Sequence, residues 1–124
     1  MAAYDNISII NAFNDCINNQ DIDGLAELMD ESHVFVDRDG SYHGPKSYMV
    51  AGWKDFFKTF TDYRNTFTEI RSEEDQVFIL GYAYWSEQEP EDHVIWTAKL
   101  KDGLITEWRI FEDTPENRLK FNLK

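Results

Sequence analysis

Apolar residues in the first half of the chain recur mostly at helical spacing. The first stripe consists of Ile7, Ile10, Phe13 and Ile17. It predicts an amphipathic helix that Asp5 or Asn6 caps and that the Asn18-Asn19-Gln20 segment ends. A second, shorter helix capped by Asp21 carries Ile22, Leu25, Ala26 and Met29 on one face. A third helix opens at Gly44-Pro45 and is apolar over a broad face made of Met49, Val50, Trp53, Phe56, Phe57 and Phe60.

Between the second and third helices, residues 33–37 have the alternation of a strand. His33, Phe35 and Asp37 share one face of it, and two valines share the other. The Arg38-Asp39-Gly40 segment then turns the chain. The strand therefore brings a carboxylate, Asp37, to its own end, where an acid can lie at the mouth or floor of a cavity.

The second half of the chain alternates between apolar and other positions, which predicts antiparallel strands. We expect them over residues 63–71, 76–87, 93–100 and 104–112, with a hairpin turn at Lys101-Asp102-Gly103 and a last helical turn within 116–124. In the longest strand, one face carries Phe78, Leu80, Tyr82 and Tyr84, and the other carries Val77, Ile79, Gly81, Ala83 and Trp85. In the last strand, Leu104, Thr106, Trp108, Ile110 and Glu112 share the face that we expect to point inward.

Helices followed by antiparallel strands predict an α+β domain in which the helices pack on one face of a curved sheet. The 124 residues are expected to form a single domain, residues 1–124, around one hydrophobic core. Aromatic residues make up 15% of the chain. So much ring surface indicates a core or a pocket built from wide, flat side chains.

The charge of the chain narrows the choice of partners. Its formal net charge is −12, and no basic cluster is present, so the sequence argues against nucleic acid and anionic membrane surfaces as partners. The first five residues have neither a basic start nor an apolar segment, so we expect no signal peptide and a cytoplasmic protein. His33, His43 and His93 lack the spacing of metal ligands, and no cofactor motif is present, so neither a metal nor a cofactor is expected.

The order of the elements resembles that of the nuclear transport factor 2-like superfamily. The segments that carry the resemblance are Asn18-Asn19-Gln20-Asp21-Ile22-Asp23-Gly24 and Asp102-Gly103-Leu104-Ile105-Thr106-Glu107-Trp108-Arg109. Within this superfamily the chain is similar to the SnoaL-like and steroid delta-isomerase-like proteins. The resemblance implies a cystatin-like cone, in which a bent antiparallel sheet wraps around three helices and encloses an apolar cavity. It also implies a homodimer formed through the outer sheet face, here Ile95, Thr97, Lys99, Glu107, Arg109, Phe111 and Trp85.

The same resemblance points to a catalytic residue. On the steroid isomerase pattern, Asp37 falls on the base that moves a proton at the carbon beside a carbonyl. The phenol donor of that pattern falls on Phe13, which has no hydroxyl, and its protonated second acid falls at about Trp96. The oxyanion hole is commonly the largest catalytic contribution, so these departures argue against steroid isomerisation.

Two related branches of the superfamily also match incompletely. The arginine and aspartate of the limonene epoxide hydrolase pattern fall near Gly81 and Ala83, and its last-strand acid falls on Ile110. In the polyketide cyclase branch a catalytic acid comes from a late strand, where Glu112 and Asp113 are the nearest acids here.

Two functions remain open at this point. The first is a cofactor-free isomerase, cyclase or dehydratase that acts on a small hydrophobic carbonyl compound, with Asp37 as general base. The second is a non-catalytic module of the same fold, for ligand binding or dimerisation, in which Asp37 only bonds the backbone of its turn or pairs with Arg38. The candidate pocket residues are Phe13, His33, Phe35, Trp53, Tyr82, Tyr84, Trp96, Trp108, Ile110 and Glu112.

Overall fold

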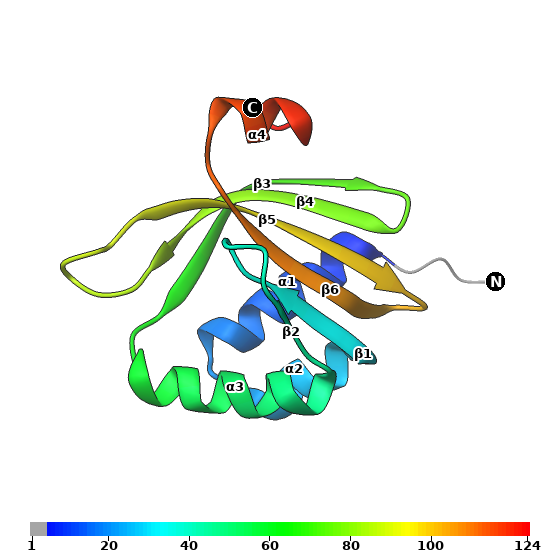
Figure 1. Cartoon of the computed structure of the whole chain (residues 1–124), viewed down its shortest axis with the longest axis vertical. Coiled ribbons are helices and arrows are strands. Elements are labelled where there is room, and N and C mark those ends of the chain that lie inside the picture. Colours follow the sequence, from blue (N-terminus) through cyan, green and yellow to red (C-terminus); the bar gives the residue numbers. More distant parts are fainter. Residues whose placement is uncertain (1–4) are drawn as a thin grey trace.

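The computed structural model describes residues 5–124 and shows a curved sheet with helices on both of its faces (Figure 1). Most of the segment on which the signal-peptide expectation depends lies outside the described residues. α1 (Asn6–Asn18) is capped by Asp5, whose side chain accepts a hydrogen bond from the Ser8 N–H at 3.1 Å. α2 (Ile22–Leu28) is capped in the same way by Asp21. Both caps confirm the sequence prediction.

α3 (Lys46–Thr59) and the short α4 (Pro115–Lys120) complete the helices. The sequence predicted Pro45 as the first helical residue of α3, but Pro45 is its cap residue and the helix begins one position later, at Lys46. None of the described helices has the length and apolar character needed to cross a membrane.

The sheet has six strands, which lie in the order β2-β1-β6-β5-β4-β3. Their bounds are β1 Met29–Val36, β2 Tyr42–His43, β3 Arg64–Glu73, β4 Gln76–Tyr84, β5 Asp92–Lys101 and β6 Leu104–Glu112. β1 runs parallel to β6, and the other neighbours pair in antiparallel fashion. The cystatin-like α+β architecture is thus confirmed. α1, α2 and α3 lie on the concave side of the sheet, and α4 lies on the other side (Figure 1).

A β-bulge changes which residues of β6 face inward. The register between β5 and β6 shifts after Lys99, so that Leu100 pairs with Ile105 while Lys99 pairs with Glu107. The extra residue turns Ile105 toward the inner core, where it is fully buried beside the helices. Strict alternation had placed Ile105 on the outer face, and that prediction is wrong.

The C-terminal tail covers part of the outer sheet face. Phe121 and Leu123 form a second buried cluster with Phe78, Leu80 and Ile95. Arg71 fixes the tail by donating to the Phe121 carbonyl oxygen at 2.7 Å. Ile95 is therefore buried within its own chain and is not free to meet a second copy. Trp85, which we had also assigned to this outer face, lies on the inner side of the sheet. The homodimer itself stays a prediction.

Candidate ligand-binding site

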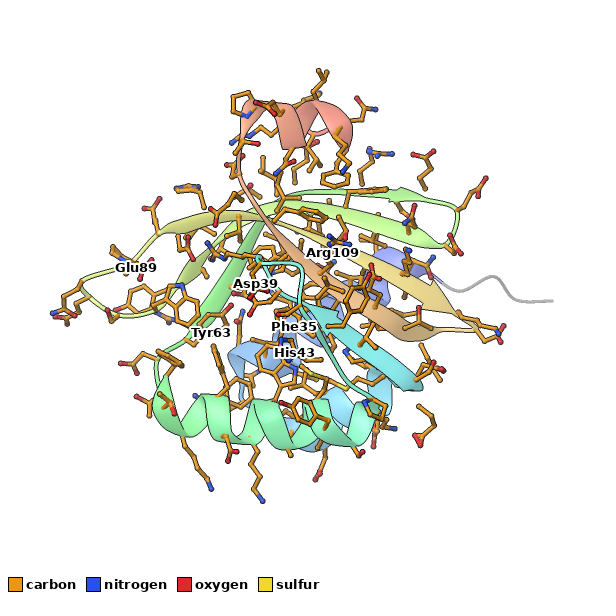
Figure 2. The ribbon with its side chains drawn as sticks, in the orientation of Figure 1. Phe35, Asp39, His43, Tyr63, Glu89 and Arg109 are labelled. Carbon is orange, nitrogen blue, oxygen red and sulfur yellow. The ribbon has the colours of Figure 1, made fainter. Side chains whose placement is uncertain are left out.

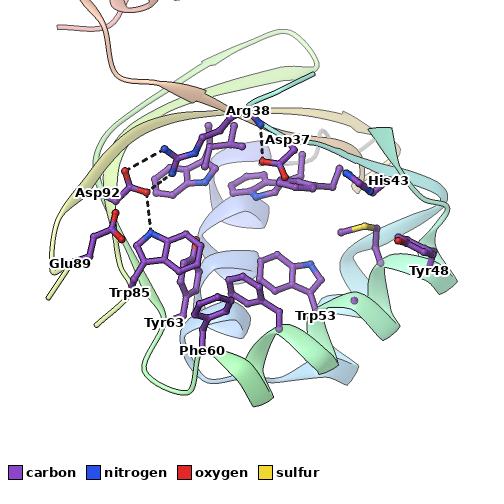
Figure 3. Close-up of a pocket in the computed structure, with 17 residues that line it drawn as sticks. Asp37, Arg38, His43, Tyr48, Trp53, Phe60, Tyr63, Trp85, Glu89 and Asp92 are labelled. Carbon is purple, nitrogen blue, oxygen red and sulfur yellow. Dashed lines mark hydrogen bonds and ion pairs between the residues drawn. The ribbon is translucent and has the colours of Figure 1, made fainter. Parts of the chain in front are cut away.

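A cavity of about 680 Å³ lies between α3 and the concave face of the sheet (Figure 3). Its volume is in the range that accommodates small organic ligands. Rings line most of it, because three strands and α3 all direct aromatic side chains into the same space, where Phe35 and Tyr63 lie in Figure 2. The lining residues are Phe35, Asp37, Arg38, His43, Tyr48, Met49, Gly52, Trp53, Phe56, Phe60, Tyr63, Trp85, Glu89, Asp92, Trp96, Trp108 and Ile110.

The sheet supplies one wall of the cavity. Trp96 on β5 and Trp108 on β6 stack with their ring centroids 6.2 Å apart, and both are almost fully buried. Ile110 follows Trp108 on the same face of β6. Trp53 of α3 faces this wall from across the cavity (Figure 3). These residues lie where the sequence pattern placed them.

An aromatic cluster closes one end of the cavity. The Trp85 ring lies 5.6 Å from Phe56, 5.0 Å from Phe60 and 4.8 Å from Tyr63, measured between centroids. Burial raises the pKa of the Tyr63 phenol. Tyr63 is therefore protonated at neutral pH, and its hydroxyl group carries a hydrogen that can be donated.

Asp37 lies at the mouth of the cavity, directly after β1 (Figure 3). One of its oxygens, Oδ1, accepts a hydrogen bond from the Arg38 backbone N–H at 2.7 Å, and its own carbonyl accepts from the Gly40 N–H. Its other oxygen, Oδ2, accepts no hydrogen bond from residues 5–124. Asp37 therefore accepts a hydrogen bond from the backbone of its own turn, as the second of the two hypotheses expected. It still offers a free carboxylate oxygen at the cavity mouth.

The Arg38 side chain bonds to other acids. Its guanidinium bridges Asp92 at the start of β5 and Glu112 at the end of β6, with Nη1 of Arg38 2.9 Å from Oε1 of Glu112. Burial opposes the charge of Arg38, but these two carboxylates outweigh it and raise the pKa of the guanidinium. Asp92 also accepts from the Trp85 indole N–H at 3.0 Å. The predicted alternative of an Asp37–Arg38 side-chain pair is replaced by this network.

Sequence reasoning missed the network and most of the aromatic cluster. Arg38 and Asp92 are 54 positions apart, and nothing in the spacing of their charges indicates that they meet. Trp85 carried a usable signal, because strand alternation placed it on the same face as Ile79 and Ala83, which are buried in the inner core.

Two predicted pocket residues lie behind the cavity. Phe13 is fully buried and packs against Trp108 with centroids 5.1 Å apart. His33 is 1% exposed, and its Nδ1 lies 2.8 Å from the Ile105 carbonyl oxygen. Burial lowers the pKa of His33, so its imidazole is neutral and donates to that carbonyl. Both residues belong to the packed core and do not line the cavity.

Three further predicted pocket residues lie elsewhere, and their placement corrects the sequence analysis. Tyr82 packs beside His93, and the Arg64 guanidinium lies 5.0 Å from the centre of the Tyr84 ring, so both tyrosines are outside the cavity lining. The sequence pattern had separated the two faces of this strand correctly, but we chose the wrong one as the inner face. Glu112 has a side chain that is 58% exposed and pairs with Arg38 outside the cavity.

No group of three or more histidine, cysteine or acidic side chains within residues 5–124 is close enough to hold a metal ion. His43 lies on the opposite side of the cavity lining from Asp92 and Glu89 (Figure 3). The polar side chains of this lining can donate and accept hydrogen bonds.

Comparison with known proteins places this architecture in a family. The SnoaL-like domain matches residues 10–108 of the chain. The chain belongs to the SnoaL-like family. Its structural neighbours include NTF2-like proteins, so it has the fold that the sequence resemblance to the nuclear transport factor 2-like superfamily indicated. None of the curated proteins matches the chain.

Several solved structures share the fold at low sequence identity. A proposed polyketide cyclase from Sinorhizobium meliloti is 19% identical over 83% of this chain and 93% of its own, with a TM-score of 0.74. An uncharacterised cystatin-fold protein from Novosphingobium aromaticivorans is 12% identical over 89% of this chain and all of its own, with a TM-score of 0.79. TerC, co-crystallised with polyporic acid, is 16% identical over 94% of this chain and 95% of its own, with a TM-score of 0.74. At these identities the likeness shows the fold of this SnoaL-like protein alone.

Proposed function

We propose that this SnoaL-like protein binds a small, hydrophobic, ring-containing carbonyl compound in the cavity and moves a proton on it without a cofactor. Trp96 and Trp53 supply wide aromatic surfaces on opposite walls of the cavity, and a flat ring fits between such surfaces. Among the structural neighbours, a proposed polyketide cyclase and the TerC complex with polyporic acid are consistent with such a ligand.

The proposal depends on the hydrogen bonds and the solvent exposure of the three carboxylates that line the cavity. Asp92 is engaged by Arg38 and Trp85, and Glu89 is exposed to solvent. Asp37 is half-buried and keeps one oxygen free of hydrogen bonds from the described chain. A free carboxylate oxygen beside apolar rings is what a general base needs in order to reach a carbon-bound proton.

In this scheme the base and the donor are different residues. Asp37 takes a proton from the carbon beside the carbonyl, and the protonated Tyr63 phenol donates a hydrogen bond to the carbonyl oxygen. Tyr63 would supply the phenol that is absent at Phe13. Preorganised donors of this kind stabilise the enolate charge as it develops.

The test uses 2-tetralone, a two-ring ketone with exchangeable protons beside its carbonyl. NMR in D2O measures how fast those protons exchange for deuterium. Asp37→Asn should lower the protein-catalysed rate by roughly 10²–10⁴-fold, which is the usual contribution of a positioned base. Glu89→Gln is the matched control, because it removes another lining carboxylate and should leave the rate unchanged. Circular dichroism checks that both variants are folded. Equal exchange by Asp37→Asn and the natural protein would rule out Asp37 as the base.

A second function is favoured by Phe13 and Trp96. These two residues stand where the steroid isomerase pattern has its phenol and its second acid, and neither offers an oxygen donor. A non-catalytic binding module of the same fold would bind 2-tetralone without accelerating exchange above the rate in buffer. Its affinity for the ketone would be the same in Asp37→Asn and in the natural protein.

A further inference from the structure

His43 is the one histidine in the described part of the chain that lines the cavity (Figure 3). It lies on β2, where it pairs directly with Phe35 of β1. Its imidazole stacks with the Phe35 ring at 6.2 Å and with the Tyr48 ring at 6.4 Å, and the planes of His43 and Tyr48 differ by only 11°. Two stacked neighbours hold the imidazole in one orientation at the cavity wall.

A short chain of hydrogen bonds leads from His43 away from the cavity. The Nε2 atom of His43 lies 2.9 Å from the Ser41 hydroxyl oxygen. That hydroxyl lies 2.6 Å from Oδ1 of Asp39, which also accepts the Ser41 backbone N–H at 2.8 Å. The three residues are at alternate positions across the turn between β1 and β2, so one local segment builds the whole arrangement.

The direction of each bond follows from counting hydrogens. Hydrogen bonds from the Ser41 hydroxyl and backbone lower the pKa of Asp39, so at neutral pH its carboxylate is ionised and only accepts. A serine hydroxyl has a single hydrogen, and here it is donated to Asp39. The Ser41 oxygen must then accept from His43, so the hydrogen of the neutral imidazole is on Nε2.

The other ring nitrogen, Nδ1, is left with a free lone pair. It has no hydrogen-bond partner among residues 5–124, and it is not one of their fully buried unpaired atoms. We propose that Nδ1 of His43 is a fixed hydrogen-bond acceptor for the ligand, and that Ser41 and Asp39 are positioning residues that set its tautomer. The cavity then selects ring compounds that carry a hydroxyl group.

This inference rests on the proposed function, because it assumes that a ring compound occupies the cavity. It adds one property of that ring compound, namely that it carries a hydroxyl group. Asp37 and His43 lie at the same end of the cavity (Figure 3), so the recognised hydroxyl lies on the part of the ring closest to the proposed base. Its O–H donates to Nδ1 of His43, and no bond is broken in this step.

The first experiment measures the tautomer directly. Nitrogen-15 NMR of the whole protein at about pH 8, above the ordinary pKa of histidine, distinguishes the protonated from the unprotonated ring nitrogen. We expect the hydrogen of His43 on Nε2 in the natural protein and a mixture of the two tautomers in Ser41→Ala and Asp39→Asn. A hydrogen on Nδ1 in the natural protein would overturn the inference, even if the cavity binds ligands.

The second experiment compares 2-naphthol with its methyl ether, 2-methoxynaphthalene, which has no hydroxyl hydrogen. The natural protein should prefer the naphthol by about fivefold in Kd, corresponding to one ordinary hydrogen bond. His43→Phe keeps a ring of similar shape for the stacking contacts and removes the acceptor, so this preference should disappear. Calorimetry measures all four affinities, and circular dichroism confirms that the variant is folded.

The outcomes separate this inference from the proposed function. If both compounds bind and the preference persists in His43→Phe, the cavity takes ring compounds and only the role of His43 is overturned. If neither compound binds the natural protein, ring binding in the cavity is overturned, and the role of His43 as a ligand acceptor is overturned with it.

Discussion

The two faces of the sheet use aromatic residues in different ways. On the inner face, Trp96 and Trp108 form a wall of a cavity that α3 spans without filling. On the outer face, the rings of Phe78 and Phe111 are covered by Phe121 of the chain's own tail, at 5.5 Å and 4.9 Å between centroids. Both faces of β4 carry apolar side chains, so hydrophobicity alone does not distinguish the face with a cavity from the face that is packed.

The difference comes from the element that covers each face. α3 packs against β1 and α2, and bulky side chains such as Trp53 and Phe60 fill only part of the space between this helix and the sheet. The tail is short and is tied closely to the sheet by Arg71. A helix held away from a sheet leaves room for a ligand, whereas a tail fixed to the sheet excludes one.

The largest expected effect concerns the packed outer face. Phe121→Ala should lower the free energy of unfolding by about 3 kcal/mol, because it removes a nearly buried ring and leaves a void between the tail and the sheet. Urea unfolding measures the change. Leu119→Ala on the neighbouring helix is the matched control, since Leu119 is 83% exposed and its loss should change stability by less than about 0.5 kcal/mol. Similar losses in the two variants would mean that the tail does not pack on the sheet.

Local patterns in the sequence were enough to predict much of this fold. The stripe that contains Ile10, Phe13 and Ile17 gave the first helix, and the aspartate caps gave the start of two helices. Strand alternation gave the paired faces of β4 and β5. These features depend on residues close together in the chain, which is why one sequence is sufficient to identify them.

The site was harder to predict because it depends on contacts between distant residues. The inner face of β4 is defined by what packs on it, and the pattern that groups Tyr82 with Tyr84 is the same whichever face is inside. The bulge that turns Ile105 inward breaks the alternation at one position. The bond from Arg38 to Asp92 joins two segments that the sequence gives no reason to pair.

A smaller effect is expected for the ion pair that holds the tail. Arg118 donates two hydrogen bonds to Asp113, at 2.6 Å and 2.7 Å, and these bonds lower the pKa of the Asp113 carboxyl. The pKa of Asp113 is lower in the folded state than in the unfolded state, so the pair stabilises the fold fully at pH values above the unfolded-state pKa. This stabilisation is lost as the pH falls through the folded-state pKa of Asp113. Asp113→Asn should therefore cost about 1 kcal/mol at pH 7.

The pH dependence of the stability loss in Asp113→Asn tests the ion pair more sharply than its size at pH 7. The difference in unfolding free energy between the natural protein and Asp113→Asn should stay constant down to about pH 5 and shrink below the ordinary aspartate pKa of about 3.9. Urea unfolding at several pH values measures it. A difference that grows on acidification would contradict the assignment of the ion pair. The cavity should bind 2-naphthol equally well in both proteins at pH 7, because Asp113 does not line it.

The smallest effect on stability is expected for a ring that lines the cavity. Phe60 is 37% exposed and lies on the edge of the Trp85 cluster, so Phe60→Ala removes contacts from one side of a space that is already open. The free energy of unfolding should fall by less than about 1 kcal/mol, well under the loss for Phe121→Ala, although both changes delete the same side chain.

Binding should show the opposite order for these two phenylalanines. Phe60→Ala removes apolar surface from the proposed ligand site and should weaken 2-naphthol binding, while Phe121→Ala lies on the other side of the sheet and should leave it unchanged. Urea unfolding and calorimetry on the two variants give both quantities. A stability loss for Phe60→Ala as large as that for Phe121→Ala would mean that the rings close over a solid interior, because only a filled space makes the removal of a ring so costly.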